Sequence, residues 1–438
     1  MSKLKKVNVI GAGLAGCECA YILATHGIKV KLYEMKPEHK SEAHKSNNFA
    51  ELVCSNSLKS NEITNACGLL KKEMEILGSL FVKVANETRV PAGQALAVDR
   101  ELFSKKITEI ILENKNIEVV YKQIESLEEL EGITVIATGP LTSSNFLKNI
   151  EEMVGKESLY FFDAAAPIVD ADSIDMNIVY VMDRYGKTET GDYINLPMSK
   201  QQYEAFYNEL INAKEAPRHD FDKIELFEGC MPIEYMARRG EKTLTFGPLK
   251  PIGLDNPKTG EKNYAVVQLR AENSEKTMYN LVGFQTSLSF GEQKRVFRMI
   301  PGLEKAEFIR YGVMHKNTYV NAGNILDDNF CFKKNSNIYF AGQISGVEGY
   351  VESAASGMMV AYSIISKLNG KKITFPENTM LGSLAKYIST ENKNYQPMNA
   401  NFGIIKPLNE KIKDKKEKYT KIANIAIESI TRFSENLN

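Results

Sequence analysis

The feature that most constrains this chain is a glycine-rich turn near its N-terminus, the GAGLAG segment at residues 11–16, which has the pattern GxGxxG. An apolar segment at 6–10 precedes it and predicts a buried strand, and the small and apolar residues at 17–26 predict a helix. A second predicted strand, at 28–34, ends in the acidic residue Glu34. This order of strand, glycine turn, helix, strand and acid is typical of a dinucleotide-binding unit.

The three glycines of the turn, the start of the helix and the final acid each have a physical role in such a unit. Gly11 permits the tight turn, Gly13 lets a pyrophosphate approach the backbone, and Gly16 lets helix and strand pack closely. The helix N-terminus presents unpaired N–H groups and the positive end of its dipole to the phosphates. Glu34 is placed to accept hydrogen bonds from a ribose. The turn therefore predicts that the first part of the chain binds the adenosine half of a dinucleotide cofactor.

Two later segments favour FAD over a nicotinamide cofactor. Residues 132–140 form a predicted strand that runs into a turn with Thr138 and Gly139, and residues 337–343 form another that ends in Gly342 and Gln343. Both resemble the later dinucleotide-contact strands of two-dinucleotide-type flavoproteins. The resemblance implies an FAD site assembled from both ends of the chain. The sequence has no second GxGxxG, so NAD(P)H lacks a Rossmann fingerprint of its own.

The segment between these two ends departs from the doubly wound pattern. It carries short β-like runs at 178–182, 264–269 and 278–282 and one predicted helix at 200–213. We therefore expect an α/β fold in which an FAD-binding Rossmann-like domain receives an inserted α+β domain. The expected division is 1–155 for the first part of the FAD-binding domain, 156–304 for the insertion, and 305–438 for the second part with a basic C-terminal helix.

Composition sets limits on location and partners. The 438 residues suffice for two or three domains. There is no run of eighteen apolar residues and no secretory signal, so we expect a cytoplasmic protein. Formal net charge is zero, with 55 Lys+Arg against 55 Asp+Glu, and a nucleic-acid footprint would have to be local. Oligomeric state is open between monomer and homodimer.

Two of the six cysteines stand in unusual surroundings. Cys54 lies where an apolar stretch gives way to polar residues, with Asn56 and Ser57 as possible N-cap donors. Cys230 lies between Gly229 and Pro232, shortly before several cationic side chains that would favour a nucleophilic thiolate. Free cysteines are more often inert packing, as we expect for the other four, so both interpretations stay open here for these two. No spacing indicates a metal site.

Near the C-terminus, residues 406–421 contain seven lysines against three acids, and apolar residues at helical spacing follow. The run is either a solvated turn before a docking helix or a contact for a phosphate backbone. The lysines that would make such a contact are Lys411, Lys413, Lys415, Lys416 and Lys418. Elsewhere, His315 has Arg310 nearby, and this pair is a candidate for binding an anionic, aromatic ligand.

Eight blocks in order make the chain resemble the folate- and FAD-dependent RNA uracil-5-methyltransferases. They include Asn48-Phe49-Ala50-Glu51-Leu52-Val53-Cys54-Ser55-Asn56-Ser57 and Phe227-Glu228-Gly229-Cys230-Met231-Pro232-Ile233-Glu234. The other six lie at 96–100, 162–169, 264–270, 310–315, 346–357 and 396–403.

The resemblance implies a reaction, its cofactors and residue roles. A one-carbon unit passes from 5,10-methylenetetrahydrofolate, through flavin N5, to C5 of a uridine in RNA, and NAD(P)H reduces the FAD. Cys230 matches the nucleophile that adds to uracil C6, and Cys54 matches a second thiol that helps to remove the C5 proton. His315, with Arg310, matches the folate site. Tyr350 matches a tyrosine near the flavin.

The resemblance leaves the substrate open. Gln94 replaces a usual glycine, and the block at 287–290 lacks the usual His or Asn and the Trp that follows it. Most members of the family act on the T-loop uridine of tRNA, whereas one branch acts on 23S rRNA. Two other classes are a tRNA wobble-modifying flavoprotein, which lacks the Cys54 and Cys230 blocks in this form, and a flavoprotein RNA chaperone without catalysis.

Overall fold

A computed structural model gives the fold of most of the chain. It describes residues 6–41, 43–155, 158–164, 166–185, 191–216, 231–257, 259–260, 262–272, 276–312, 314–391, 397–410 and 412–437, with the backbone alone at 158–164 and 314–316. Among the helices of this described part, none combines the length and apolar character that crossing a membrane requires.

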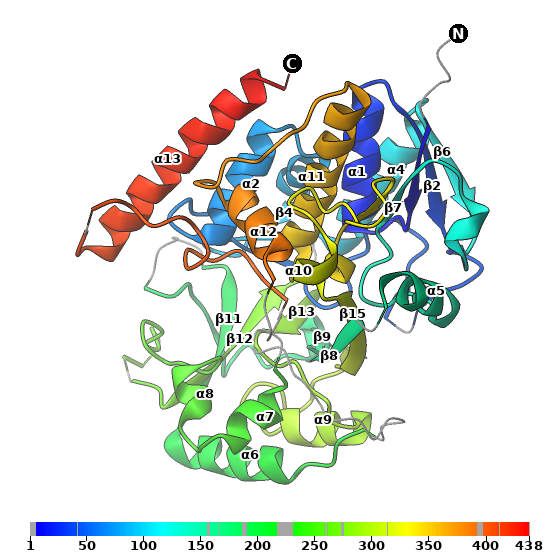
Figure 1. The fold of residues 1–438 in the computed structure, drawn as a ribbon. Helices are drawn as coiled ribbons and strands as arrows, with labels where there is room; N and C mark the ends of the chain where they lie inside the picture. The colour runs from blue at the N-terminus through cyan, green and yellow to red at the C-terminus, as the bar shows by residue number, and fades with distance from the viewer. Residues whose placement is uncertain are drawn as a thin grey trace.

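A five-stranded parallel sheet forms the first layer and brings together both ends of the chain (Figure 1). Its strand order is β16-β7-β1-β2-β6. The strands are β1 (Lys6–Ile10), β2 (Lys29–Glu34), β6 (Ile117–Tyr121), β7 (Ile133–Ile136) and β16 (Ile338–Phe340). The strands predicted around the glycine turn and in the two later segments are all present, and the doubly wound α/β prediction is confirmed.

Two helices from opposite ends of the chain pack against each other beside this sheet. They are α1 (Leu14–Thr25) and α11 (Tyr350–Leu368) (Figure 1). A Cβ added to Gly357 of α11 would lie 2.1 Å from the carbonyl oxygen of Ala15, so only glycine permits this approach. The helix α1 begins three residues before its predicted start, directly after the glycine turn.

Further elements complete this domain around one apolar core. A small sheet has the order β3-β5-β4, with β3 (Ser57–Ser60), β5 (Ala95–Val98) and β4 (Arg89–Val90). The remaining helices are α2 (Ala66–Ile76), α3 (Leu80–Glu87), α4 (Arg100–Glu113), α5 (Ser144–Val154), α10 (Ala322–Ile325), α12 (Met380–Ser389) and α13 (Lys415–Glu435).

The inserted unit has its own antiparallel sheet and its own apolar core. The strand order is β10-β11-β12-β13-β9-β14, with β10 (Tyr180–Val181), β11 (Tyr193–Met198), β12 (Ala265–Ala271), β13 (Met278–Leu281), β9 (Ile168–Asp170) and β14 (Phe308–Arg310). Its helices are α6 (Lys200–Asn212), α7 (Ile233–Arg238), α8 (Thr243–Phe246) and α9 (Phe290–Phe297). The β-like runs expected in this segment are present as β10, β12 and β13 of one sheet, and the expected helix is present as α6.

The chain enters and leaves the inserted unit through two paired strands. β8 (Ser158–Ala164) pairs antiparallel with β15 (Met314–Val320) along their full length. β14 lies beyond the expected boundary between residues 304 and 305, yet it pairs with β9 in the sheet of the insertion. We therefore propose that the insertion extends to the start of β15, because a cut at 304 would separate an edge strand from its sheet.

The C-terminal helix α13 packs along α2 at one side of the molecule (Figure 1). Its buried residues Ile422, Ala423, Ala426 and Ile430 follow the predicted helical spacing. The helix begins earlier than the apolar pattern suggests, at Lys415, because Asp414 accepts a hydrogen bond from the Glu417 N–H and caps it. Part of the lysine run thus lies on the first turns of a helix.

Candidate functional site

A deep cleft of about 1110 Å³, part of it open to solvent, lies at the carboxyl ends of the parallel strands. The glycine turn, the end of β2, the turn after β7 and the start of α11 all line it. Eight of the predicted cofactor residues reach its wall: Gly11, Gly13, Glu34, Thr138, Gly139, Gly342, Gln343 and Tyr350. Segments more than three hundred residues apart thus form one continuous cavity.

The three glycines of the turn differ in what surrounds them. A Cβ on Gly11 would lie 2.6 Å from the Ala137 carbonyl oxygen, and one on Gly16 would lie 1.8 Å from the Gly11 carbonyl oxygen. A Cβ on Gly13 would meet nothing within 4 Å, because Gly13 faces the cleft. Gly11 and Gly16 are therefore required by packing, whereas Gly13 leaves space for a ligand.

The Glu34 side chain ties the glycine turn to the end of β2. One carboxylate oxygen accepts the Ala12 N–H at 3.0 Å and the other accepts the Lys36 N–H at 2.9 Å. The carboxylate is buried but still lines the cleft. An oxygen that keeps a free lone pair there can accept a ribose hydroxyl, as the sequence predicts. Gly13, the N-cap of α1, has no side chain to bind the N–H groups of the first turn, so these groups suit a pyrophosphate.

Cys54 lies against Tyr350, the first residue of α11. The sulfur is 2.8 Å from the tyrosine hydroxyl oxygen, which also accepts the N–H groups of Cys54 at 2.7 Å and Ser55 at 3.3 Å. Two N–H donors occupy the lone pairs of the hydroxyl oxygen, so its hydrogen is directed at the sulfur. Burial raises the pKa of Tyr350 well above its usual value, and the neighbouring Cys54 adds to this. The tyrosine therefore keeps its proton and stabilises a Cys54 thiolate.

Arg100, at the start of α4, holds the chain just before Cys54. Its guanidinium donates to the carbonyl oxygens of Leu52 at 3.0 Å and Val53 at 3.4 Å and pairs with Glu272 at 2.7 Å. Burial alone would lower the pKa of Arg100, but its pairing with Glu272 raises it. The positive charge stays beside the Cys54 and Tyr350 pair, where it favours the thiolate.

Arg270, in β12 of the inserted unit, holds the chain just after Cys54. It donates to the Ser55 hydroxyl at 2.8 Å and to the Asn56 side-chain oxygen at 3.0 Å. The Asn56 amide in turn donates to the carbonyl oxygens of Val98 at 3.0 Å and Ala271 at 2.8 Å. The Cys54 loop thus sits between the two units and is fixed by both.

The expectation that Asn56 and Ser57 serve as N-cap donors is wrong. The chain after Cys54 continues into strand β3, not into a helix. The side-chain amide of Asn56 instead donates both of its N–H groups, to the carbonyl oxygens of Val98 and Ala271 in the two units.

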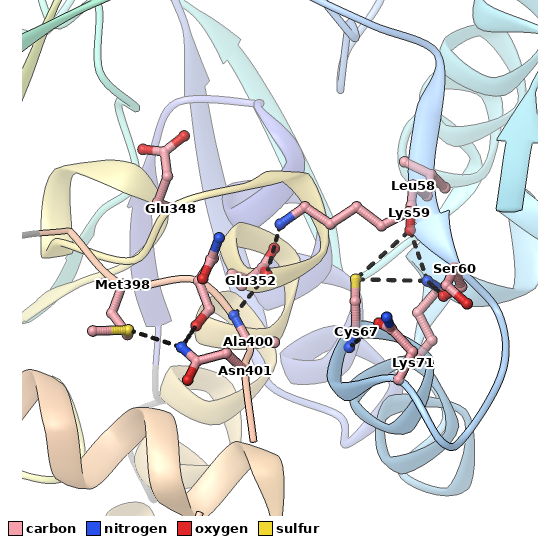
Figure 2. Close-up of polar contacts among 12 residues, drawn as sticks. Leu58, Lys59, Ser60, Cys67, Lys71, Glu348, Glu352, Met398, Ala400 and Asn401 are labelled. Atoms are coloured by element: carbon pink, nitrogen blue, oxygen red, sulfur yellow. Dashed lines mark hydrogen bonds and ion pairs between the residues drawn. The ribbon is translucent and has the colours of Figure 1, made fainter. Parts of the chain in front are cut away.

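A second set of contacts fixes the start of α11, as Figure 2 shows. Glu352, whose side chain is fully buried, accepts Lys59 Nζ at 3.2 Å and the Ala400 N–H at 2.9 Å. Although burial acts in the opposite direction, the negative charge of Glu352 raises the pKa of Lys59. Lys59 follows the Cys54 loop and Glu352 shares the first turn of α11 with Tyr350, so this ion pair holds the thiol and the tyrosine in register.

Four other cysteines are buried, as expected from their sequence surroundings. Burial raises the pKa of Cys17 and of Cys19, and it raises that of Cys67 and Cys331 to about 11. A buried thiol with a raised pKa is a poor nucleophile. Among the cysteines whose surroundings the structure describes, only Cys54 is partly accessible.

The structure describes some of the remaining predicted site residues and not others. Cys230 and Lys411 lie outside the described residues, and of His315 only the backbone, in β15, is described. Arg310, at the end of β14, lies close enough to Cys54, Tyr350 and Arg100 to interact electrostatically with all three. Burial, followed by the positive charge of Arg100, lowers the pKa of Arg310. Lys413, Lys415, Lys416 and Lys418 are exposed at and before the start of α13.

Sequence reasoning missed three residues of the site, Arg100, Arg270 and Glu272. The two arginines end blocks that the family resemblance singles out, at 96–100 and 264–270, so a signal was present without a role attached to it. Within the part of the chain that the structure describes, no group of three or more His, Cys, Asp or Glu side chains is arranged to hold a metal ion.

Comparison with known proteins agrees with the full-length resemblance. The model of the family described as glucose inhibited division protein A matches residues 6–372. A methylenetetrahydrofolate–tRNA-(uracil-5-)-methyltransferase TrmFO of Acetivibrio thermocellus is 56% identical over 429 residues, 98% of each chain. Proteins of the same name from Fusobacterium nucleatum and Staphylococcus carnosus are 56% and 52% identical, over 97% and 98% of this chain and 98% and 99% of theirs.

Among solved structures, the GidA protein of Aquifex aeolicus has the same fold. Its form I crystal structure superposes with a TM-score of 0.71 at 16% sequence identity and covers 99% of this chain and 76% of that one. At this identity the likeness concerns the fold alone.

Proposed function

This chain belongs to the family of the methylenetetrahydrofolate–tRNA-(uracil-5-)-methyltransferases, within the broader glucose inhibited division protein A family, and from that premise we propose that it methylates C5 of a uridine in tRNA. The carbon donor is 5,10-methylenetetrahydrofolate, and NAD(P)H-reduced FAD supplies the electrons. The T-loop uridine is the proposed target, and the protein acts in the cytoplasm, where tRNA is found.

The observation that carries the proposal is the Cys54 thiol at 2.8 Å from the Tyr350 hydroxyl, beside the dinucleotide cleft. Once a one-carbon unit has been added to uracil C5, the C5 proton must leave, and a thiolate held beside the flavin site can act as the base for that step. A thiol held ready for ionisation next to a flavin site is the arrangement that this chemistry needs.

The residues that line the cleft fit FAD. Glu34 would hold the adenosine half of FAD, and the glycine turn would hold its pyrophosphate. The part of FAD between the pyrophosphate and the flavin ring would be held by Thr138, Gly139, Gly342 and Gln343. When bound and reduced, FAD supplies the reducing equivalents for converting a methylene unit into a methyl group.

The two proposed thiols divide the work on uracil. The Cys230 thiolate adds to C6, which breaks the C5–C6 double bond and leaves C5 electron-rich, so that C5 takes up the one-carbon unit. The Cys54 thiolate then takes the proton from C5, and the electron pair of that C–H bond forms a double bond to the one-carbon unit as the nitrogen carrier of this unit leaves. Two-electron reduction would then convert the unit into a methyl group and restore the C5–C6 double bond as Cys230 leaves. The Tyr350 hydroxyl and the Arg100 charge support this role because both stabilise Cys54 as the thiolate before it takes the proton.

Two further binding sites belong to this proposal. Arg310 and His315 would bind folate, and the charge of Arg310 beside the thiol and tyrosine suits the anionic part of such a ligand. The lysines at and before the start of α13 would contact RNA phosphates. Figure 1 draws the start of this helix at the opposite side of the molecule from α5, which lines the cleft, so an RNA that reaches both must be extended.

The alternatives are less well supported. The relatives that match along the full chain are named for tRNA, which disfavours the 23S rRNA alternative. The chain contains the Cys54 and Cys230 blocks, which the wobble-modifying flavoproteins lack in this form, and this disfavours that alternative. An RNA chaperone without catalysis gives no reason for the hydrogen bond between Tyr350 and Cys54.

The test uses the purified flavoprotein with 5,10-methylenetetrahydrofolate and NADPH. It is given an unmodified tRNA transcript or unmodified large-subunit rRNA, and new 5-methyluridine is mapped by mass spectrometry. We expect methylation of the T-loop uridine in wild type and its loss in Cys54→Ala and Cys230→Ala, with flavin still bound. Methylation of the rRNA alone would overturn the tRNA assignment, and wild-type rates in both variants would overturn the thiol mechanism.

A further inference from the structure

Three aromatic rings form a short stack at the edge of the inserted unit. The rings of Phe308 and Tyr311 are nearly parallel, with centroids 5.2 Å apart and planes at 13°. The ring of Phe290 stacks on the other side of Tyr311, at 4.8 Å and 16°. Phe290 ends the stack and is 54% exposed, which is unusual for so large an apolar side chain. The stack therefore presents an aromatic surface to solvent.

Two hydrogen bonds join the segments that carry Phe290 and Tyr311. The buried side chain of Gln293, one turn after Phe290 in α9, donates to the Gly312 carbonyl oxygen at 2.8 Å and accepts the Gly312 N–H at 2.8 Å. This pair of bonds fixes α9 to the residue that follows Tyr311. Because these bonds hold the rings of Phe290 and Tyr311 in contact, Phe290 is pre-organised as a surface for a flat ligand.

The position of the stack connects it to the reaction site. Tyr311 directly follows Arg310, whose guanidinium interacts electrostatically with Cys54 and Tyr350. Phe290 and Tyr311 are not part of the cleft wall. On the same side of α9 as Phe290, Lys294 is exposed and has no acidic partner among the residues that the structure describes. An aromatic face with a free cation nearby matches the base and the phosphate of a nucleotide.

From this arrangement we propose that Phe290 is a stacking platform for a base of the RNA substrate that flanks the target uridine. The proposal rests on the proposed function, because it takes the substrate of that reaction as its ligand. A uridine whose C6 is to meet a thiol must leave its stack, and its neighbours then lose a stacking partner. The exposed ring of Phe290, which Tyr311 connects to Arg310, would replace that partner without reading the sequence of the RNA.

The first test compares two exposed phenylalanines of the same unit. In Phe290→Ala we expect the KM for tRNA to rise roughly five- to hundredfold, as for the loss of one base–aromatic stack. The kcat at saturating RNA, the KM for methylenetetrahydrofolate and the rate of flavin reduction should stay within about twofold of wild type. The control is Phe246→Ala: Phe246 is 76% exposed and lies on α8, at the other end of the unit (Figure 1). We expect it to behave as wild type.

The second test needs no turnover, so it stays informative if the proposed methylation itself fails. The chain has no tryptophan, so Phe290→Trp introduces a single fluorescent reporter that can still stack. We expect tRNA without folate or NADPH to quench this tryptophan, with no comparable change in Phe246→Trp, and we expect Phe290→Trp to bind tRNA with the wild-type dissociation constant.

Three results would overturn the proposal. One is an unchanged KM for tRNA in Phe290→Ala. Another is quenching of Phe290→Trp by folate and not by tRNA, which would assign the ring to the p-aminobenzoyl group of the folate. The third is no change in fluorescence with either ligand. Quenching of Phe290→Trp by tRNA, together with a wild-type protein that forms no 5-methyluridine, would instead refute the proposed function and leave the platform in place.

Discussion

The hydroxyl oxygen of Tyr350 lies 2.8 Å from the sulfur of Cys54, although 296 residues separate the two in sequence. The same oxygen accepts two backbone N–H groups of the Cys54 loop. The hydroxyl hydrogen is therefore directed at the sulfur, and one side chain both positions the loop and stabilises the thiolate.

The first prediction removes this hydrogen bond. Tyr350→Phe keeps the ring but loses the donor to sulfur, so the pKa of the Cys54 thiol should rise and methylation should slow by roughly ten- to hundredfold. The pH dependence of alkylation by iodoacetamide, measured in a Cys230→Ser background, reports the ionisation of Cys54. An alkylation profile that does not move when the hydroxyl is removed would contradict this role for Tyr350.

The second prediction concerns the contacts between the inserted unit and the Cys54 loop. Arg270→Met deletes the donors to Ser55 and Asn56, so the thiol should lose its fixed position. We expect kcat to fall roughly tenfold or more with little change in the KM for tRNA, because positioning acts on the reacting geometry. The control is Arg295→Met, which removes an exposed ion pair with Glu209 in the same unit. Equal losses in the two variants would show a general effect of removing an arginine.

These contacts also show how far the sequence could predict the site. Gly11, Gly13, Gly16 and Glu34 lie within one short segment, and their local pattern by itself indicates their task. The hydrogen bond between Arg270 and Asn56 joins residues 214 positions apart, and the sequence around neither residue indicates it.

The error at Asn56 has the same origin. A polar residue after an apolar stretch is a good helix N-cap when only its neighbours are considered. Here the chain continues into β3, not into a helix. The side-chain amide of Asn56 donates instead to a carbonyl oxygen of β12, which belongs to the inserted unit and lies far away in sequence. Tertiary structure thus decides the role of the side chain.

The third prediction separates two glycines of the same turn. Gly13→Ala places a methyl group in open space facing the cleft, so the protein should fold with near wild-type stability but retain less FAD. Gly16→Ala drives a methyl group to 1.8 Å from the Gly11 carbonyl oxygen, so it should lower the stability of the protein itself. Thermal unfolding of flavin-stripped protein and the FAD content after purification distinguish the two. Equal unfolding temperatures for the two stripped variants would contradict the packing argument.

The fourth prediction tests the lysines at the start of α13. If Lys415 and Lys416 contact phosphates, the double change to Gln should weaken tRNA binding and reduce the slope of log affinity against log salt by about 1 to 2. Lys371 and Lys372 are also exposed, and their double change to Gln alters net charge equally. Binding titrations over a range of salt concentrations compare the two. The same slope in both double variants would mean that α13 is a docking helix without an RNA contact.

The last prediction concerns pH and stability, and its subject is Glu73 in α2. Its fully buried carboxyl group accepts the N–H groups of Met380 at 2.8 Å and Leu381 at 2.9 Å, at the start of α12. Burial raises the pKa of Glu73 from its usual 4.5 to about 8. Between these values the folded protein holds a proton that the unfolded chain has released. The stability from this group is complete below about pH 4.5 and is lost as pH rises toward 8.

Glu73→Gln removes this titration while keeping one acceptor oxygen for the start of α12. Urea unfolding at pH 5, 6, 7 and 8 should show wild type losing up to about 1.4 kcal/mol more per pH unit than the variant. Some slope will remain in the variant, because burial also raises the pKa of Glu18 to about 7. The control is Glu75→Gln on the same helix, an exposed residue paired with Lys72, and it should follow wild type. Parallel curves for Glu73→Gln and wild type would mean that Glu73 is ionised throughout, with the α12 N–H groups outweighing the cost of its burial.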